Sequence, residues 1–250
     1  FICRQKFSYS LAWLNNMSRS PLLDIEFNRR LLVEVFKEVM KLKENIDVYL
    51  DLGAGDGSLT EFVSRYLQPK RTIVVDIDPT NIEICKSKGF EAHLLDLNRD
   101  ELPFLNDSID LVTMFETLEH ICNTDHALKE VFRVLRPGGI FILSTPNLAS
   151  WINRLALLLG RPPYHYNVSF KYPIHGPLYR HAPYGHIRLY THGLLLKHLE
   201  AVGFRACKIY GALTPINPLL LRKITIMLSK IRPSLASDLI FIATKPARVR

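Results

Sequence analysis

The sequence predicts an α/β fold, a Rossmann-like seven-stranded and mostly parallel sheet with helices on both faces. Between residues 48 and 145, short apolar runs alternate with segments of helical periodicity. The runs TIVVDI and GIFILST are apolar at nearly every position, as expected for strands buried on both faces. A glycine-rich turn at residues 53–57 joins the first strand to the next helix. Such alternation is typical of βαβ units.

The first helix is predicted at residues 26–45, where Phe27, Leu31, Val35 and Val39 recur at helical spacing. A short apolar strand follows at 48–52, and a helix at 58–66 opens after the glycine turn. Further strands are predicted at 71–76, 91–95, 108–115 and 140–145, and further helices at 80–88 and 125–135. Pro137, Gly138 and Gly139 predict a tight turn into the strand at 140–145.

The second half changes character. A helix is predicted at 192–202, with Thr191 as its N-cap and Gly203 closing it. Two more strands, at 205–211 and 239–244, complete the sheet, and two insertions lie at about 146–190 and 212–237. We therefore expect one domain over residues 26–250 and an N-terminal arm over residues 1–25. The first residues match a secretory signal poorly, and a start at Met17 remains an alternative to the arm.

The composition excludes several classes of protein. With 48% hydrophobic and 22% charged residues, the chain is neither disordered nor fibrous. No apolar run approaches the ~20 residues that span a bilayer. Residues 1–150 hold 17 Lys/Arg and 22 Asp/Glu, a net charge of −5, whereas residues 151–250 hold 15 and 2, a net charge of +13. This asymmetry indicates an anionic partner for the C-terminal part.

The four cysteines lie far apart and form no CxxC pair. They therefore predict neither a zinc site nor a disulfide framework, and no metal ligand is assigned. The expected location is the cytoplasm, with the membrane surface as an alternative.

The segment LDLGAGDG carries the clearest chemistry. Its glycines allow a sharp turn and a close ligand approach, and the following helix offers amide donors to an anionic group. Asp76 closes the next strand, about 20 residues on, where an acid can hold ribose hydroxyls. The spacing departs from the dinucleotide pattern, because the third glycine is Gly57 and Ser58 follows it. Asp51 suits a positively charged ligand group rather than a phosphate.

These segments, with ETLEHI and FRVLRPGGIFILSTPN, resemble the class I S-adenosylmethionine-dependent methyltransferases, most closely those acting on small molecules and quinones. The resemblance is dense over residues 48–147 and looser through GHIRLYTHGLLLKHLEAVGF. It implies S-adenosylmethionine as the methyl donor. It also implies a cofactor site made by residues that follow successive strands: Asp51, Gly53, Ala54, Gly55, Gly57, Asp76, Ile77, Asp96, Leu97 and Phe115.

The implied roles follow the parts of the cofactor. The glycines would line its methionine half, and Asp51 would meet its amino group. Asp76 would take the ribose hydroxyls, with Ile77 against the adenine. Asp96 and the amide of Leu97 would address the adenine ring's polar atoms, and Phe115 would approach the cofactor from below.

Methyl transfer to a hydroxyl or an acidic carbon also requires loss of a proton, which a histidine can accept. His120 follows the fourth strand, and His186 opens the segment that resembles the substrate-side lid; each is a candidate base or substrate ligand. Packing of the histidine rings within the fold is the alternative. Arg180, Arg188 and Tyr184 are candidate substrate-binding residues for an acidic group.

The sequence thus predicts methyl transfer to a small-molecule or lipid-like acceptor, at oxygen or carbon. No Asn/Asp-Pro-Pro-Tyr motif follows the fourth strand, which in the resemblance disfavours exocyclic base amines and glutamine. The rivals are a non-catalytic S-adenosylmethionine-binding domain and a nicotinamide-dependent oxidoreductase. The stretches 150–160 and 216–232 combine apolar and basic residues, so they predict either a membrane-surface contact or ordinary amphipathic helices. Nucleic acid is disfavoured because the basic residues are scattered.

Overall fold

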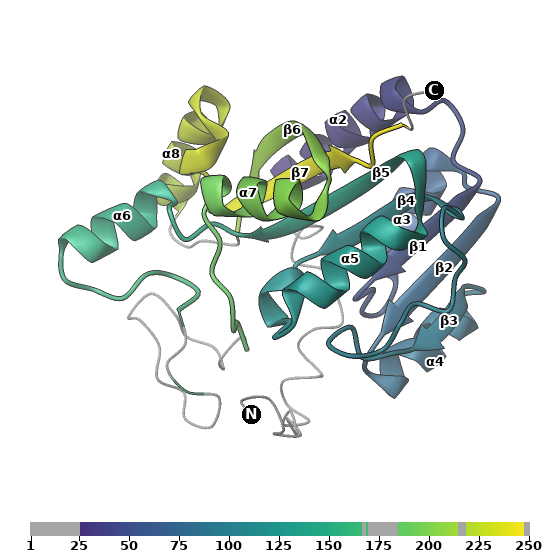
Figure 1. Ribbon diagram of the computed structural model, residues 1–250. Coiled ribbons are helices and arrows are strands. Elements are labelled where there is room, and N and C mark those ends of the chain that lie inside the picture. Colours follow the sequence, from purple (N-terminus) through teal and green to yellow (C-terminus); the bar gives the residue numbers. More distant parts are fainter. Residues whose placement is uncertain (1–25, 167–168, 170–184, 215–218, 248–250) are drawn as a thin grey trace.

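The sheet has seven strands in the order β3-β2-β1-β4-β5-β7-β6 (Figure 1). The computed structural model describes residues 26–166, 169, 185–214 and 219–247. Strands β1 to β5 are parallel, and β7 pairs antiparallel with both β5 and β6. The predicted α/β class and mostly parallel sheet are therefore confirmed. The strands are β1 Val48–Leu52, β2 Arg71–Asp76, β3 Glu91–Leu94, β4 Ile109–Phe115, β5 Leu135–Pro146, β6 Arg205–Ala212 and β7 Asp238–Thr244.

Helices cover both faces of the sheet, and each face has its own apolar core. Helices α2 (Glu26–Leu42) and α3 (Ser58–Leu67) bury residues such as Phe36 and Val63 against one face. Helices α5 (Thr124–Val134) and α7 (His192–Val202) bury residues such as Leu128 and Leu199 against the other. Helix α4 (Pro79–Ser87) lies beside β2 and β3. The buried strands explain why their sequences are apolar at nearly every position.

The strand order indicates at which edge of the sheet a ligand would bind. From β1 the chain adds β2 and β3 on one side, whereas β4 and β5 lie on the other. This reversal between β1 and β4 is a topological switch point, and ligands of open α/β sheets bind outside the carboxyl ends of the strands there. The glycine turn follows β1 directly, and η2 (Leu118–His120) lies just after β4.

Two predicted boundaries are wrong by more than one residue. Helix α2 ends at Leu42, three residues before the predicted end, because the chain turns there to enter β1. Strand β5 begins at Leu135 and runs through Gly138 and Gly139. Its pairing passes from Ile109↔Leu135 to Leu111↔Ile140, so the glycines form an irregularity within the strand rather than a separate turn. Gly138 has φ +77°, a conformation that glycine adopts at little steric cost.

The two insertions each contribute a helix in their described parts, α6 (Trp151–Leu158) and α8 (Leu219–Ile231). Trp151 Nε1 donates a hydrogen bond of 2.8 Å to Thr225 Oγ1, which joins the two helices. Figure 1 shows both at one end of the molecule, beyond the sheet. A short 3₁₀ turn, η3 (Pro233–Leu235), leads from α8 to β7. Within the described ranges, every helix is too short or too polar to cross a bilayer.

Candidate active site

The turn after β1 is built by three glycines with positive φ: Gly53 at +73°, Gly55 at +55° and Gly57 at +73°. A Cβ on Gly53 would lie 2.3 Å from Thr117 Oγ1, so the turn packs tightly against the segment after β4. A Cβ on Gly55 would have no neighbour within 4 Å. The backbone is therefore crowded at Gly53 and open at Gly55, which leaves room for a ligand beside the middle of the turn.

Asp76, at the end of β2, holds the turn in place. Its Oδ2 accepts a hydrogen bond of 2.8 Å from the Gly55 amide, and its Oδ1 accepts one of 2.8 Å from the Asp78 amide. Burial raises the pKa of Asp76. Next to it, the Ile77 side chain is 57% exposed and offers an apolar surface at the same edge of the sheet.

Asp51 lies at the end of β1, buried beneath the turn. Its two carboxylate oxygens accept hydrogen bonds from Thr60 Oγ1 (2.5 Å) and Thr113 Oγ1 (2.6 Å). Desolvation raises the pKa of Asp51 to about 6, although the hydroxyl donors act in the opposite direction. A carboxylate accepts about four hydrogen bonds, so Asp51 retains acceptor capacity for a cationic group.

The remaining predicted cofactor residues follow β3 and β4. Asp96 Oδ1 accepts hydrogen bonds from the Asn98 amide (3.0 Å) and Asn98 Nδ2 (2.8 Å), and Leu97 packs against the core at the edge of the sheet. Phe115 is buried in the cluster beneath α2 and α3. The fold thus gathers the predicted cofactor residues at or just after the carboxyl ends of four neighbouring strands.

The structure brings His120 and His186 together. Their ring centroids lie 4.9 Å apart, although the two residues come from η2 and from the segment before α7. The backbone carbonyl of Glu119 accepts hydrogen bonds from the amides of Ile187 (2.8 Å) and Arg188 (3.0 Å), which fixes one segment against the other. Desolvation lowers the pKa of His120 to about 4, so the imidazole is neutral at physiological pH.

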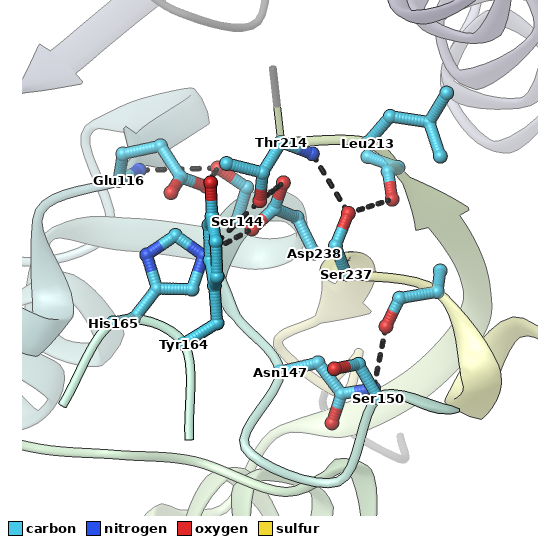
Figure 2. Close-up of polar contacts among 12 residues, drawn as sticks. Glu116, Ser144, Asn147, Ser150, Tyr164, His165, Leu213, Thr214, Ser237 and Asp238 are labelled. Atoms are coloured by element: carbon cyan, nitrogen blue, oxygen red, sulfur yellow. Dashed lines mark hydrogen bonds and ion pairs between the residues drawn. The ribbon is translucent and has the colours of Figure 1, made fainter. Parts of the chain in front are cut away.

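A buried group of carboxyls lies beside these histidines, and sequence analysis missed it. Glu116 and Asp238 stand at the same edge of the sheet, where Ser144 Oγ donates to Glu116 Oε1 (2.6 Å) and Thr214 Oγ1 donates to Asp238 Oδ2 (2.7 Å). Figure 2 shows Glu116 directed toward Ser144 and Asp238 toward Thr214, with His165 and Tyr164 beside them. Desolvation raises the pKa of Glu119 to about 8, and it raises those of Glu116 and Asp238 well above their usual range.

Two signals in the sequence pointed to these acids. Glu116 and Glu119 are spaced three residues apart in ETLEH, directly before His120. Asp238 is one of only two acids after residue 150 and directly precedes an apolar strand. Neither signal revealed burial, because the partners come from distant parts of the chain.

The structure describes only one of the three predicted substrate-binding residues. Arg188 is exposed, and its Nη2 donates a hydrogen bond of 2.8 Å to the Cys122 carbonyl oxygen. Arg180 and Tyr184 lie outside the described residues. Their roles therefore stay predictions.

Residues 50–143 match the family model described as a methyltransferase domain. This segment is a methyltransferase domain. It contains the glycine turn, Asp76, Asp96 and the ETLEH motif. The sequence-based recognition of the S-adenosylmethionine-dependent methyltransferases, and of the cofactor that this family uses, is confirmed at the level of the domain.

Curated relatives agree over the same region of the methyltransferase domain. A probable S-adenosylmethionine-dependent methyltransferase of Mycolicibacterium smegmatis is 33% identical over 98 residues, which is 39% of this chain and 37% of that protein. The ubiquinone/menaquinone biosynthesis C-methyltransferase UbiE of Vibrio vulnificus is 36% identical over 97 residues, which is 36% of this chain and 37% of that protein. The matched part spans little more than a third of each relative.

Solved structures resemble the chain over most of its length. An S-adenosylmethionine-dependent methyltransferase from Clostridium acetobutylicum has a TM-score of 0.61 at 16% identity, covering 90% of this chain and 94% of that one. The [4+2]-cyclase SpnF has a TM-score of 0.59 at 17% identity, covering 88% and 81%. At such identities the similarity establishes the fold alone.

Proposed function

We propose that this protein transfers a methyl group from S-adenosylmethionine to a small-molecule or lipid-like acceptor, at oxygen or carbon. The main support is the glycine turn, which is open at Gly55 and held by Asp76 at the topological switch point of a methyltransferase domain. A sulfonium and an ammonium group favour carboxylate neighbours, and Asp51 lies beneath this turn. The adenosine half needs an apolar surface with a few polar contacts, which Ile77, Asp96 and Leu97 would supply.

The acceptor would meet the methyl group on the side of His120 and His186. Methyl transfer is an in-line displacement, so holding the nucleophile close to the methyl carbon and excluding water supplies much of the catalysis. His186 is buried and His120 is partly buried. His120 lies in η2, just after the carboxyl end of β4, and its ring lies 4.9 Å from that of His186. We assign them to the acceptor as bases or ligands. The UbiE relatives are quinone C-methyltransferases by name, which favours a quinone-like acceptor and transfer to carbon.

A lipid-like acceptor fits the outer surface of α6 and α8. Both helices expose large apolar side chains and carry no acidic residue, while basic residues accompany them in the sequence. The exposed apolar residues are Leu155, Leu157, Leu158, Leu159, Leu220, Met227 and Ile231. Apolar residues together with cations favour an anionic membrane interface. We therefore propose a peripheral membrane contact at this end of the molecule.

A cofactor-binding protein without methyl transfer is the main alternative. The fold is shared with a protein described as a cyclase, so the fold by itself does not imply methyl transfer. The two functions differ in turnover. Release of S-adenosylhomocysteine with label in an acceptor would support the methyltransferase, and cofactor binding without label transfer across a metabolite and quinone screen would support the alternative.

The cofactor assignment is tested by titration calorimetry of the full chain with S-adenosylmethionine and with NAD. We expect binding of S-adenosylmethionine only. Asp76→Ala should weaken it by about 10- to 100-fold, because two ribose hydroxyls and the Gly55 amide lose their acceptor at a cost of ~1–3 kcal/mol. Asp125→Ala is the control, since that side chain is 73% exposed and pairs with His198. Preference for NAD, or an unchanged affinity in Asp76→Ala, would overturn the assignment.

A further inference from the structure

Three side chains near the acceptor side have the composition of a metal site. Glu119, His120 and His186 each present one possible ligand atom, and these atoms all lie within 4.8 Å of one another. They come from η2 and from the segment before α7, which the Glu119 carbonyl holds together through its bonds to the Ile187 and Arg188 amides. Ligands around a zinc ion at ~2.1 Å stand roughly 3.4 Å apart, so modest side-chain rotation closes the set.

The two imidazoles are oriented by backbone carbonyls. His120 Nδ1 lies 3.2 Å from the Gly185 carbonyl oxygen, and His186 Nδ1 lies 3.2 Å from the His165 carbonyl oxygen. Since a carbonyl only accepts, Nδ1–H is the donor in both rings, and Nε2 carries the lone pair of each neutral imidazole. Metal-binding histidines commonly donate their other N–H to a carbonyl or carboxylate in this way.

Glu119 supplies an independent sign of a missing ligand. Its side chain is 1% exposed, and neither of its carboxylate oxygens has a partner in hydrogen-bonding geometry. Asp238 Oδ1 is also buried without a partner. Buried oxygens of this kind are costly unless a hydrogen bond or an ion satisfies them. Thr145 and Glu116 lie close enough to Glu119 to lower its pKa, against the larger effect of burial. Neither side chain meets the geometry of a hydrogen bond with the Glu119 carboxylate.

Within the part of the chain that the structure describes, lysine and arginine are also absent from the ion pairs of these carboxyls. In the described residues, no lysine or arginine forms an ion pair with Glu116, Glu119 or Asp238. The basic side chains near them are histidines: His120 and His186 beside Glu119, and His165, whose Nε2 lies 3.9 Å from Asp238 Oδ1. Glu119 and Asp238 are buried and Glu116 is partly buried, so their ionisation is unfavourable without a cation. A divalent cation would supply the absent positive charge.

We propose that Glu119, His120 and His186 bind one divalent transition-metal ion, with Glu116 beside the site as a further carboxylate. Two imidazole nitrogens and one carboxylate oxygen favour ions such as Zn²⁺, Co²⁺ or Mn²⁺ over Mg²⁺ and Ca²⁺, which prefer oxygen ligands. Three protein ligands leave coordination positions for oxygen atoms. If the proposed methyltransferase activity holds, those positions would orient an acceptor that carries oxygen next to the reacting atom.

The first experiment measures metal binding without any turnover. The full chain is treated with a chelator, desalted, and titrated separately with Zn²⁺, Mn²⁺ and Mg²⁺ by calorimetry, with the bound metal counted by elemental analysis. We expect one Zn²⁺ per chain, bound at least tenfold more tightly than Mg²⁺. Glu119→Gln and His186→Gln should each weaken Zn²⁺ binding at least tenfold. His198→Gln is the matched control, because that histidine pairs with Asp125 and does not belong to the proposed ligand set.

The second experiment uses the unaltered chain, so it stands even where a buried substitution prevents folding. High-spin Co²⁺ shifts the exchangeable N–H protons of bound imidazoles far outside the normal NMR range. Two such signals are expected, one from each Nδ1–H, with no thiolate-to-cobalt charge-transfer band. No shifted N–H signal, a thiolate band, or Zn²⁺ binding unchanged in both folded variants would overturn the metal site.

The experiments distinguish failure of the metal-site proposal from failure of the proposed function. The metal-free chain could take up no Zn²⁺ and still bind S-adenosylmethionine and transfer label. That result would contradict the metal site and support the methyltransferase. The chain could instead bind one Zn²⁺ at Glu119, His120 and His186 and fail to bind S-adenosylmethionine. That result would support the metal site and contradict the methyltransferase.

Discussion

Gly53 and Gly55 share a left-handed backbone conformation but differ in what surrounds them. Gly53 packs against Thr117, so it requires both a positive φ and the absence of a side chain. Gly55 requires only the positive φ, because space is open around its Cα. One glycine therefore serves packing between the β1 turn and the segment after β4, and the other leaves access for a ligand.

Alanine substitutions should separate these two roles. Both Gly53→Ala and Gly55→Ala place a side chain at positive φ, which costs about 1–2 kcal/mol of folding free energy. Gly53→Ala should cost more, by a further 1–3 kcal/mol or so, because its Cβ would lie 2.3 Å from Thr117 Oγ1. Urea denaturation measures the difference. Equal losses of stability in the two variants would contradict the packing role of Gly53.

Asp51 predicts a pH dependence of stability. Its pKa rises from 3.8 to about 6 on folding, so between these values the unfolded chain loses its proton while the folded chain keeps it. The associated stabilisation is complete below pH 4 and is lost as the pH rises through about 6. The loss amounts to about 3 kcal/mol in the free energy of unfolding.

Asp51→Asn tests this assignment, because asparagine keeps the shape and does not titrate. Chemical denaturation between pH 4 and pH 7 should show a smaller decrease of stability in this variant than in the unaltered chain. The remaining decrease belongs to other buried carboxyls such as Glu119. The same slope in both proteins would remove Asp51 as its source.

At the scale of elements, helix α7 and the turn η2 position the two histidines proposed to face the acceptor. Thr191 Oγ1 accepts a hydrogen bond from the Leu194 amide at the start of α7, and Gly203, with φ +114°, closes the helix. The segment just before α7 carries His186 and is fixed to Glu119 in η2 by backbone hydrogen bonds. The boundary of α7 therefore also sets where the buried histidine lies.

Removal of the Thr191 cap should loosen this arrangement. Thr191→Ala leaves one amide of the first turn without its side-chain acceptor, and we expect a loss of ~1 kcal/mol in the free energy of unfolding. Thr191→Ser retains the hydroxyl and should restore most of the stability. Thermal or urea denaturation of the three proteins compares them, and an equally unstable serine variant would assign the effect to the methyl group instead.

At the scale of the whole molecule, α6 and α8 bring basic and exposed apolar residues to one end. Helix α6 carries Arg154 and α8 carries Arg222, Lys223 and Lys230, and the two helices meet through Trp151 and Thr225. Leu158 is 83% exposed and Leu220 is 68% exposed on these helices. Exposed leucines beside cations are the features expected of a surface that inserts shallowly at anionic lipid.

Vesicle sedimentation tests this surface. The unaltered chain should sediment with vesicles containing about one-third phosphatidylserine and not with neutral phosphatidylcholine, and added salt should release it. Leu158→Glu should reduce binding about tenfold, because it replaces apolar surface with a like charge to the lipid. Leu105→Glu is the control, since Leu105 is 81% exposed in the loop before β4. An equal reduction in both variants would contradict a specific contact at α6 and α8.

The order of strands and helices was largely predictable from the sequence. Periodic burial and glycine turns act over a few residues, so β1, β2 and α7 appear at their predicted bounds. The ends of α2 and β5 were predicted less well, because the entry into β1 and the pairing of β5 with β4 decide them. Those pairings join segments far apart in the chain.

What the sequence determined by itself is the domain: alternating elements, a glycine turn after β1 and an acid at the end of β2, which together match a methyltransferase family. Only the tertiary structure decided that Glu119, His120 and His186 meet, and that among the described residues Asp238 Oδ1 is buried without a hydrogen-bond partner. The physical reason is that backbone periodicity is a local property. Burial and charge balance depend on segments that become neighbours only after folding.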